Sequence, residues 1–273
     1  MIPLSDIAKR IQDVSYPFDY SVCTIVSDMG QYQLMLNSFI EAGFSTDKCE
    51  YMYVDNTKTN VHDAFSAFNI FLRQALGKYI IICHQDVELK FDTIFELEQK
   101  IDQVCKIDPK WGLLGNAGAI NLKYKTVCIT HGVPPFHDKR GTSFPQKVQT
   151  LDENFILIKN EANLAVSSDL NGFHLYGTDI CIIAKILGYN AYVIDFHLYH
   201  KSRGTLDQSF FMLKKALQKK YEKALKGRFV QTVTVAKMYI SGNKLVNIIC
   251  NTSVARTCSR QYLKLKLFIT GKY

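Results

Sequence analysis

The feature that most constrains the fold is a regular alternation of short β-rich runs and amphipathic segments over the first 115 residues. The run Tyr79–Cys83 is apolar throughout, which is typical of a strand buried on both faces of a parallel sheet. Three further strands are predicted with it: Ser21–Ser27, Cys49–Val54 and Trp111–Gly115. Helical spacing of apolar residues predicts helices between them: Gln31–Ala42, Asn60–Leu76 and Phe91–Val104. This order predicts an α/β fold, with a mostly parallel sheet flanked by helices.

The segment that follows breaks this regularity. Residues 129–147 hold three prolines and two glycines, which predicts a long loop that serves as a lid or binding segment. Beyond it, Val148–Ile158 reads as a strand with an acidic pair, Thr178–Leu187 as a helix and Ala191–Ile194 as a strand. Thr178 is the expected cap of that helix, as Asn60 is of the earlier one.

The formal net charge of +8 is unevenly distributed along the chain. Residues 201–273 carry 16 basic and 2 acidic side chains, whereas residues 1–200 carry a net charge of −6. We therefore predict a main domain over 1–206 and a basic C-terminal extension over 207–273. In the extension we expect a cationic helix, Asp207–Leu225, and a β-hairpin within 229–249 that turns at Ser241–Asn243.

The basic extension allows several roles. Its helix places Phe210, Leu213, Leu217 and Tyr221 on one face, which can pack on the domain and leave a solvated basic face. The same helix can instead lie on an anionic membrane surface, and the hairpin can mediate homo-oligomerisation. A further possible role of the extension is nucleic-acid binding. The aromatic and basic interleaving of an RNA-recognition motif is missing, however, so no nucleic acid is expected as a partner.

Several protein classes are disfavoured by missing motifs. The chain has no GxxxxGK[ST] loop, no GxGxxG and no GxSxG elbow, and its eight cysteines form no CxxC pair. No run of about 18 apolar residues is present, and the N-terminus lacks an apolar signal core. We therefore expect a cytoplasmic protein, with a peripheral position at the inner face of the cell membrane left open.

The sharpest chemical motif is His84-Gln85-Asp86-Val87-Glu88, directly after the buried run 79–83. Ligands of parallel sheets bind at the carboxyl ends of strands, so this motif stands at the expected edge. Carboxylate oxygens there suit Mg²⁺ or Mn²⁺, which commonly bridge to phosphates. The alternative is a solvated acidic loop.

Two later motifs are also open to two interpretations. Asp179 opens a predicted helix, where an acid is stabilised by the helix dipole or acts as a general base. His197 and His200, three residues apart, can supply a metal ligand or make ordinary hydrogen bonds.

Taken together, these residues resemble the inverting nucleotide-sugar glycosyltransferases of family 2, which have the GT-A (Rossmann-like) fold, in the branch associated with bacterial surface polysaccharides. The resemblance covers roughly residues 20–204. It is carried by VSD at 26–28, YVDN at 53–56, AFNIFLRQALGKYIIICHQDVEL at 67–89, LDENFIL at 151–157 and GFHLYGTDICIIAKILGYNAYVID…HLYHKSRG at 172–204.

For the donor side, the resemblance implies a divalent cation, Mn²⁺ or Mg²⁺, at the position of the family's DxD motif. That position is His84-Gln85-Asp86, so the first Asp of the motif is replaced by His84. Asp86 is the implied metal ligand, with Glu88 weaker and His200 completing the metal or diphosphate site. The implied nucleotide-sugar contacts are Ser27, Asp28, Asp55, Asn56, Asn69, His84 and Gln85.

For the acceptor side, the resemblance implies a carboxylate that deprotonates the acceptor hydroxyl. Asp179 matches that base, with Thr178 where Glu is commoner, and Asp152 is the reserve candidate. The implied reaction is inverting transfer of a sugar from a nucleotide-diphosphate sugar to a hydroxyl of a glycan or lipid-linked acceptor. The alternative, which the incomplete motifs suggest, is a catalytically silent module of the same fold that binds a sugar nucleotide or glycan.

Overall fold

The computed structural model describes residues 7–141, 143–202, 204, 207–233 and 236–270. The chain forms two compact units, Met1–Leu213 and Lys214–Tyr273, which we describe separately. The predicted domain boundary at 206/207 adjoins residues 205–206, which lie outside the described residues, and it stays a prediction.

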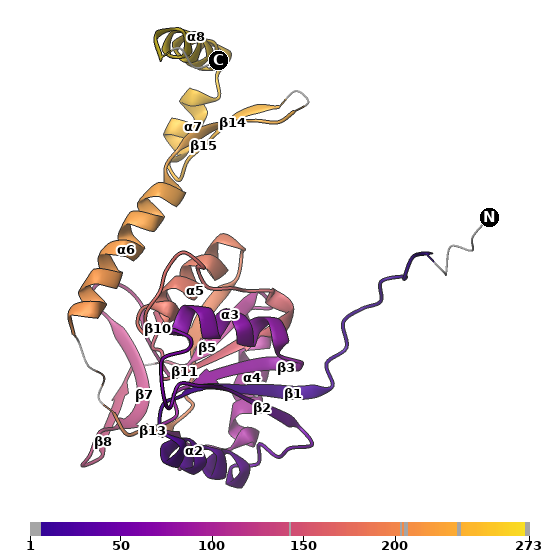
Figure 1. Ribbon diagram of the computed structural model, residues 1–273, viewed down its shortest axis with the longest axis vertical. Coiled ribbons are helices and arrows are strands. Elements are labelled where there is room, and N and C mark those ends of the chain that lie inside the picture. Colours follow the sequence, from indigo (N-terminus) through magenta and orange to yellow (C-terminus); the bar gives the residue numbers. More distant parts are fainter. Residues whose placement is uncertain (1–6, 142, 203, 205–206, 234–235, 271–273) are drawn as a thin grey trace. The chain divides into compact units, whose positions relative to one another are not determined.

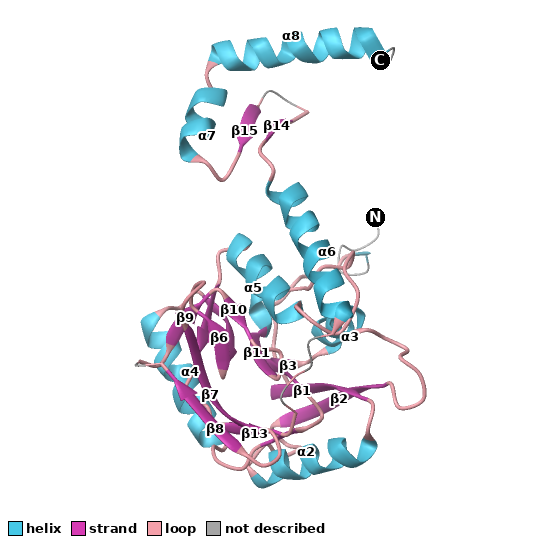
Figure 2. Ribbon diagram, turned by 90° about the vertical axis from the view of Figure 1, so that its left-hand side faces the viewer, coloured by secondary structure: helices cyan, strands magenta, loops and turns pink. Residues whose placement is uncertain are grey.

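The first unit is built on a seven-stranded sheet with the order β2-β1-β3-β11-β5-β12-β9 (Figures 1 and 2). Five strands run in one direction, and β11 and β9 run against them. Their bounds are β1 Phe18–Val26, β2 Cys49–Asp55, β3 Gly77–Cys83, β5 Trp111–Gly115, β9 Gln146–Val148, β11 Phe155–Lys159 and β12 Asn190–Val193. The predicted α/β class with a mostly parallel, helix-flanked sheet is confirmed.

Helices cover both faces of this sheet. Met35, Phe39, Leu97 and Val104, from α2 and α4, share one buried cluster with the strands. The opposite face carries α3 and α5 (Figure 2). The helices of the first unit are α2 Met29–Glu41, α3 Ala64–Gln74, α4 Ile94–Ile107 and α5 Tyr176–Ile186, with a 3₁₀ turn at Asn160–Ala162.

Two of the predicted helix caps are wrong. Asp63, not Asn60, caps α3, because its side chain accepts a hydrogen bond from the Ser66 N–H. Helix α5 begins earlier than predicted, after Leu175, which has a φ of 61° and makes no side-chain cap; Thr178 therefore lies inside the helix.

The main sheet is less regular than the element order suggests. Strand β5 does not pair with β3, because β11 lies antiparallel between them. The strand predicted over Val148–Ile158 is accordingly divided into β10 (Thr150–Leu151) and β11, with a turn at Asp152–Asn154 between them.

A second sheet replaces the predicted long loop. It has the order β10-β6-β7-β13-β4, and β8 pairs with β7. The additional strands are β4 Val87–Glu88, β6 Ala117–Ala119, β7 Lys125–His131, β8 Phe136–Arg140 and β13 Leu198–His200. The loop prediction for 129–147 was therefore wrong: the prolines and glycines mark the turn of the β7–β8 hairpin and the approach to β9.

The second unit is predominantly helical. Helix α6 (Gln208–Leu225) enters it and is followed by the hairpin of β14 (Arg228–Gln231) and β15 (Lys237–Ile240). A hairpin lies in the predicted region, but the predicted turn at Ser241–Asn243 was wrong, because its second strand already ends at Ile240. Asn243 instead caps α7 (Lys244–Cys250), which precedes α8 (Ser253–Thr270).

The close contact of β1 and β3 yields a stability test at Gly77. A Cβ at this position would lie 2.4 Å from the Ser21 backbone nitrogen, so the two strands would have to separate. We expect Gly77→Ala to lower the free energy of unfolding by about 1–3 kcal/mol. Chemical denaturation measures this, with Gly242→Ala as control, because a Cβ there meets nothing within 4 Å. Equal stability of the two variants would contradict the prediction.

Candidate functional site

The candidate site lies where β3 leaves the main sheet. Strand β3 pairs with β1 on one side and β11 on the other, and its residues Ile80–Cys83 are buried. The chain then turns at His84–Asp86 before the short strand β4, which pairs with β13. This pairing brings His200, at the end of β13, opposite Val87 and beside Asp86.

Three side chains converge at this turn. The distance from His84 Nδ1 to His200 Nε2 is 3.2 Å, and that from His200 Nε2 to Asp86 Oδ1 is also 3.2 Å. Together they form a potential metal-binding group whose ligand atoms all lie within 4.8 Å of one another; it is the one such group found in the described ranges. His200 is buried, and the other two are half-buried.

The neighbours of this group fix its geometry. Tyr176 Oη lies 3.0 Å from His84 Nε2, which leaves the opposite ring nitrogen facing His200. The backbone N–H of Ser202 donates to Asp86 Oδ2, and the Ser202 hydroxyl lies 3.0 Å from His200 Nε2. Such outer contacts hold ligand side chains in place.

The electrostatics suit an ionised Asp86 carboxylate beside a neutral His84 imidazole. Burial and the nearby charge of His200 lower the pKa of His84 to about 4. Burial opposes ionisation of Asp86. The hydrogen bond and charge of His200, the charge of His84 and the hydrogen bond from the Ser202 N–H together bring the pKa of Asp86 below its usual value. Asp86 therefore provides the negative charge of the group.

A pocket of about 410 Å³ opens beside this group and is lined by His84 and Asp86, but not by His200. Of the predicted nucleotide-sugar residues, four line it: Ser27, Asn56, His84 and Gln85. The Gln85 Oε1 accepts hydrogen bonds from the backbone N–H groups of Ser27 and Asp28, at 2.8 and 2.9 Å, and so joins the ends of β3 and β1. Asn56 closes the 57–62 loop by accepting from the Val61 N–H and donating to the His62 carbonyl.

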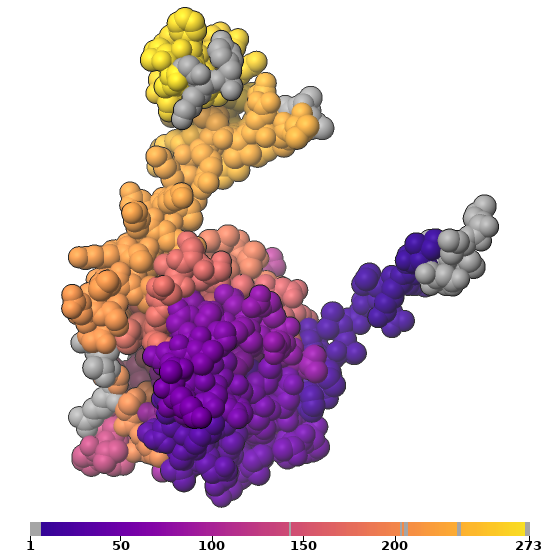
Figure 3. Space-filling model, viewed as in Figure 1, coloured from indigo at the N-terminus to yellow at the C-terminus, as the bar shows by residue number. Residues whose placement is uncertain are grey.

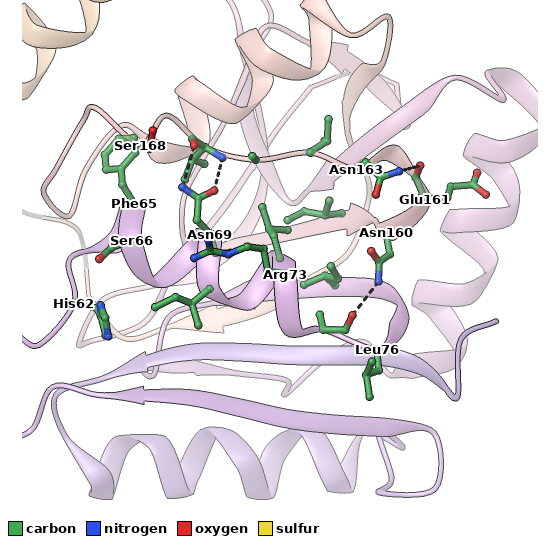
Figure 4. Close-up of a pocket in the computed structure, with 18 of the residues that line it drawn as sticks. His62, Phe65, Ser66, Asn69, Arg73, Leu76, Asn160, Glu161, Asn163 and Ser168 are labelled. Carbon is green, nitrogen blue, oxygen red and sulfur yellow. Dashed lines mark hydrogen bonds between the residues drawn. The ribbon is translucent and has the colours of Figure 1, made fainter. Parts of the chain in front are cut away.

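Three other predicted donor-site residues have their side chains engaged elsewhere. Asp28 caps α2 through the N–H groups of Gly30 and Gln31. Asp55 accepts from the backbone and hydroxyl of Thr57. Asn69 donates to the carbonyl of Val166 and accepts from its N–H, at the edge of a separate groove of about 1500 Å³ (Figure 4).

Glu88, the weaker metal candidate, lies outside the group. Its carboxylate forms ion pairs with Lys201 and Lys90, at 2.8 and 3.0 Å. His197 is also separate: its ring stacks on Phe91 at 3.8 Å, and its Nε2 lies 2.8 Å from the Thr130 hydroxyl. Of the predicted metal ligands, the structure thus brings together Asp86 and His200, and it adds His84.

The two candidate bases have opposite surroundings. Asp179 has no exposed surface, and both its oxygens accept hydrogen bonds from Ser167, one from the N–H and one from the hydroxyl, each at 2.7 Å. Asp152 is exposed, at the turn between β10 and β11. Its negative charge acts on His84, so it lies within electrostatic reach of the site.

Sequence reasoning missed Tyr176 and Glu153. Tyr176 is buried; its hydroxyl contacts His84 and donates to the Glu153 carbonyl at 3.3 Å. The Glu153 carboxylate accepts from the N–H of Gly177 at the start of α5, and a Cβ at Gly177 would lie only 3.0 Å from Glu153 Cγ. The acidic pair at 152–153 was the available signal, but only the fold shows that its second member faces the helix.

The carboxyl of Glu153 yields a test of pH-dependent stability. Burial and the charge of Asp152 raise its pKa to about 8, although the N–H groups at the start of α5 partly oppose this. The folded protein therefore holds this proton where the unfolded chain has released it. We expect stability to fall as the pH rises from about 4.5 through about 8. Thermal unfolding at several pH values measures this, and Glu153→Gln should flatten the dependence of stability on pH in this range. An unchanged slope in Glu153→Gln would contradict the prediction.

The fold and site define an α/β protein with a mostly parallel sheet and a candidate metal group at the carboxyl end of β3. The chain belongs to the family of a protein of Fuscovulum blasticum named ATP synthase subunits region ORF 6. The two are 36% identical over 219 residues, which cover 79% of this chain and 88% of that protein. That name states no activity. No family model matches the chain.

Solved structures support the fold at low sequence identity. S. aureus TarS 1-349 in complex with UDP-GlcNAc has a TM-score of 0.50 and 13% identity, over 75% of this chain and 67% of that one. A second S. aureus TarS structure has a TM-score of 0.48 and 14% identity; 75% of this chain is covered, but only 40% of that chain. The likeness at a TM-score of 0.50 concerns the fold alone, and the one at 0.48 adds no argument.

Proposed function

We propose that this protein transfers a sugar from a nucleotide-diphosphate sugar to a hydroxyl group of an acceptor. The observation that carries the proposal is the convergence of His84, Asp86 and His200 at the carboxyl end of β3, where His84 and Asp86 line the 410 Å³ pocket. This is the edge at which α/β sheets bind their ligands. The TarS structure of the same fold is a complex with UDP-GlcNAc, which supports a nucleotide-sugar donor.

The three side chains fit a divalent cation. Metal–ligand bonds of about 2.0–2.2 Å place neighbouring ligand atoms about 3.0–3.4 Å apart, and both measured separations are 3.2 Å. Two imidazole nitrogens and one carboxylate suit Mn²⁺ better than Mg²⁺, which prefers oxygen ligands. A cation held there supplies positive charge to the leaving diphosphate.

The residues around the pocket supply the remaining functions. Gln85 holds the ends of β1 and β3 together beneath the donor, and Ser27 and Asn56 provide polar contacts at the pocket wall. For the base, we assign Asp152 and not Asp179, because Asp152 is exposed and Asp179 is buried in hydrogen bonds with Ser167. Asp152 takes the proton of the acceptor hydroxyl, which is a poor nucleophile until it is deprotonated.

The finer features rest on the sequence resemblance. Attack by the acceptor opposite the leaving diphosphate, with one base, gives inversion at the anomeric carbon. The glycan or lipid-linked acceptor and the role in surface polysaccharide synthesis have the same basis. A catalytically silent sugar-nucleotide-binding module is the second candidate, because the residue that matches the family's base, Asp179, is buried.

Metal binding gives the first test of the site. Asp86→Asn and His200→Ala each remove one of the three ligands, so we expect each to weaken Mn²⁺ binding by at least tenfold in isothermal titration calorimetry. Glu88→Gln is the matched control, since Glu88 is held by Lys90 and Lys201, and it should bind Mn²⁺ as the wild type does. Unchanged Mn²⁺ binding by Asp86→Asn would contradict the assignment.

Turnover gives the second test. Wild type is incubated with Mn²⁺ and a panel of nucleotide sugars that includes UDP-GlcNAc, and release of the free nucleotide is followed by mass spectrometry. We expect Asp152→Asn to lower turnover about 10²–10⁴-fold without changing donor affinity. Glu153→Gln should keep most of the activity, because a glutamine oxygen can still accept from Gly177.

The outcomes separate the candidate functions. Donor binding by wild type without turnover would favour the silent module, and neither binding nor turnover would refute both candidates. If Asp152→Asn is as active as wild type, the base assignment is wrong and the transferase proposal stands. Asp179→Asn should act mainly on stability, which thermal unfolding measures.

A further inference from the structure

Helix α8 has an apolar face that none of the described residues of its own unit covers. Its exposed apolar side chains include Val254, Tyr262, Leu265, Phe268 and Ile269, with exposed fractions of 58–74%. Their spacing places them on one side of a helix. None of the described residues of α8 is buried, and its side chains form much of the yellow surface in Figure 3.

The rest of α8 is mainly basic and polar, with Leu263, which is 54% exposed, as an apolar exception. Arg256, Arg260, Lys264 and Lys266 lie beside and opposite the apolar face, and the helix has no acidic residue. At 18 residues it is nevertheless not apolar enough to span a bilayer, and the same is true of every helix in the described part of the chain. An amphipathic helix of this composition is suited to lying at a lipid–water interface.

The neighbouring elements hold α8 in a defined setting. Asn251, at the junction with α7, exchanges two hydrogen bonds with the backbone of Tyr239 on β15. The Arg256 guanidinium donates to the Lys237 carbonyl on the same strand. Helix α7 adds Leu245, Ile248 and Ile249, which are 59–70% exposed. The second unit thus presents apolar side chains from two helices that are tied to one hairpin.

The charge of this unit points to the chemistry of its partner. Residues 214–273 carry fourteen Lys and Arg side chains and one acidic residue, Glu222, which is a net charge of +13. Such a surface repels a second copy of itself and attracts an anionic surface. Nucleic acid would satisfy the charge, but it offers nothing to bury the Leu, Ile and Phe side chains of α8.

We propose that α7 and α8 dock the protein on an anionic lipid bilayer, with α8 in the plane of the surface and its apolar face among the acyl chains. Helix α6, the cationic helix for which the sequence left this role open, fits less well: Leu213, Leu217 and Tyr221 on its apolar face are buried. The docking surface is therefore at the far C-terminal part of the chain. It is independent of the transferase proposal, because it shares no residue with that site.

Vesicle flotation with the full-length protein tests this docking. We expect wild type to float with phosphatidylcholine vesicles that contain 30% phosphatidylglycerol, and binding to pure phosphatidylcholine vesicles should be at least tenfold weaker. Tyr262→Ser/Leu265→Ser/Ile269→Ser removes the apolar face and keeps the charge. Arg260→Gln/Lys264→Gln/Lys266→Gln removes three positive charges and keeps the apolar face. Each triple variant should lower the partition coefficient more than tenfold, since burial of apolar area and attraction by each basic residue both contribute.

A matched control removes three exposed apolar residues elsewhere. Leu34→Ser/Phe95→Ser/Ile186→Ser changes helix positions of the first unit that are 50–60% exposed, and it should float as wild type does. Circular dichroism confirms that the variants are folded. Flotation unaffected by either α8 variant, or absent for wild type, would overturn the proposal. If the protein does not bind vesicles, either tight, salt-sensitive DNA binding or self-association through the α8 apolar face would also overturn the proposal.

Discussion

The candidate site depends on the burial of β3 at the centre of the main sheet. Because Ile80–Cys83 are covered on both faces and paired on both edges, the point at which the chain leaves the sheet is fixed. His84 and Asp86 follow directly, and the β4–β13 pairing brings His200 to them from 116 residues later in the chain. A shift of β3 by one residue would turn these side chains to the other face.

The hydrogen bonds around this exit make the arrangement specific. Gln85 binds the backbone at the end of β1, and Tyr176 holds His84 from the start of α5. The elements β1, β3, β13 and α5 thus meet at one turn, and the carboxylate of Asp86 supplies its negative charge. Polar side chains that do not reach the turn have structural roles: Asp28 caps α2, and Asn69 hydrogen-bonds the backbone of Val166.

The two units divide the physical roles of the chain. The acidic first unit carries the pocket and the candidate metal group. The second unit carries a net charge of +13 and exposed apolar side chains on α7 and α8. A single net charge for the whole protein hides this division, and the basic residues of the second unit are not evidence for phosphate binding at the site.

The sequence by itself determined the α/β class, the strands of the first 115 residues and the motif at 84–88, because hydrophobic periodicity is a local property. It could not show that β11 separates β3 from β5, since strand pairing depends on contacts far apart in the chain. For the same reason the sequence predicted a loop over 129–147, where the structure has part of the β7–β8 hairpin and β9. The sequence predicted Asp86 and His200 as metal ligands, but only the tertiary structure brought His200 within reach of both His84 and Asp86 and engaged Glu88 in ion pairs. Burial decided the rest: it left Asp152 exposed and enclosed Asp179, and a residue's exposure is set by the elements that pack over it.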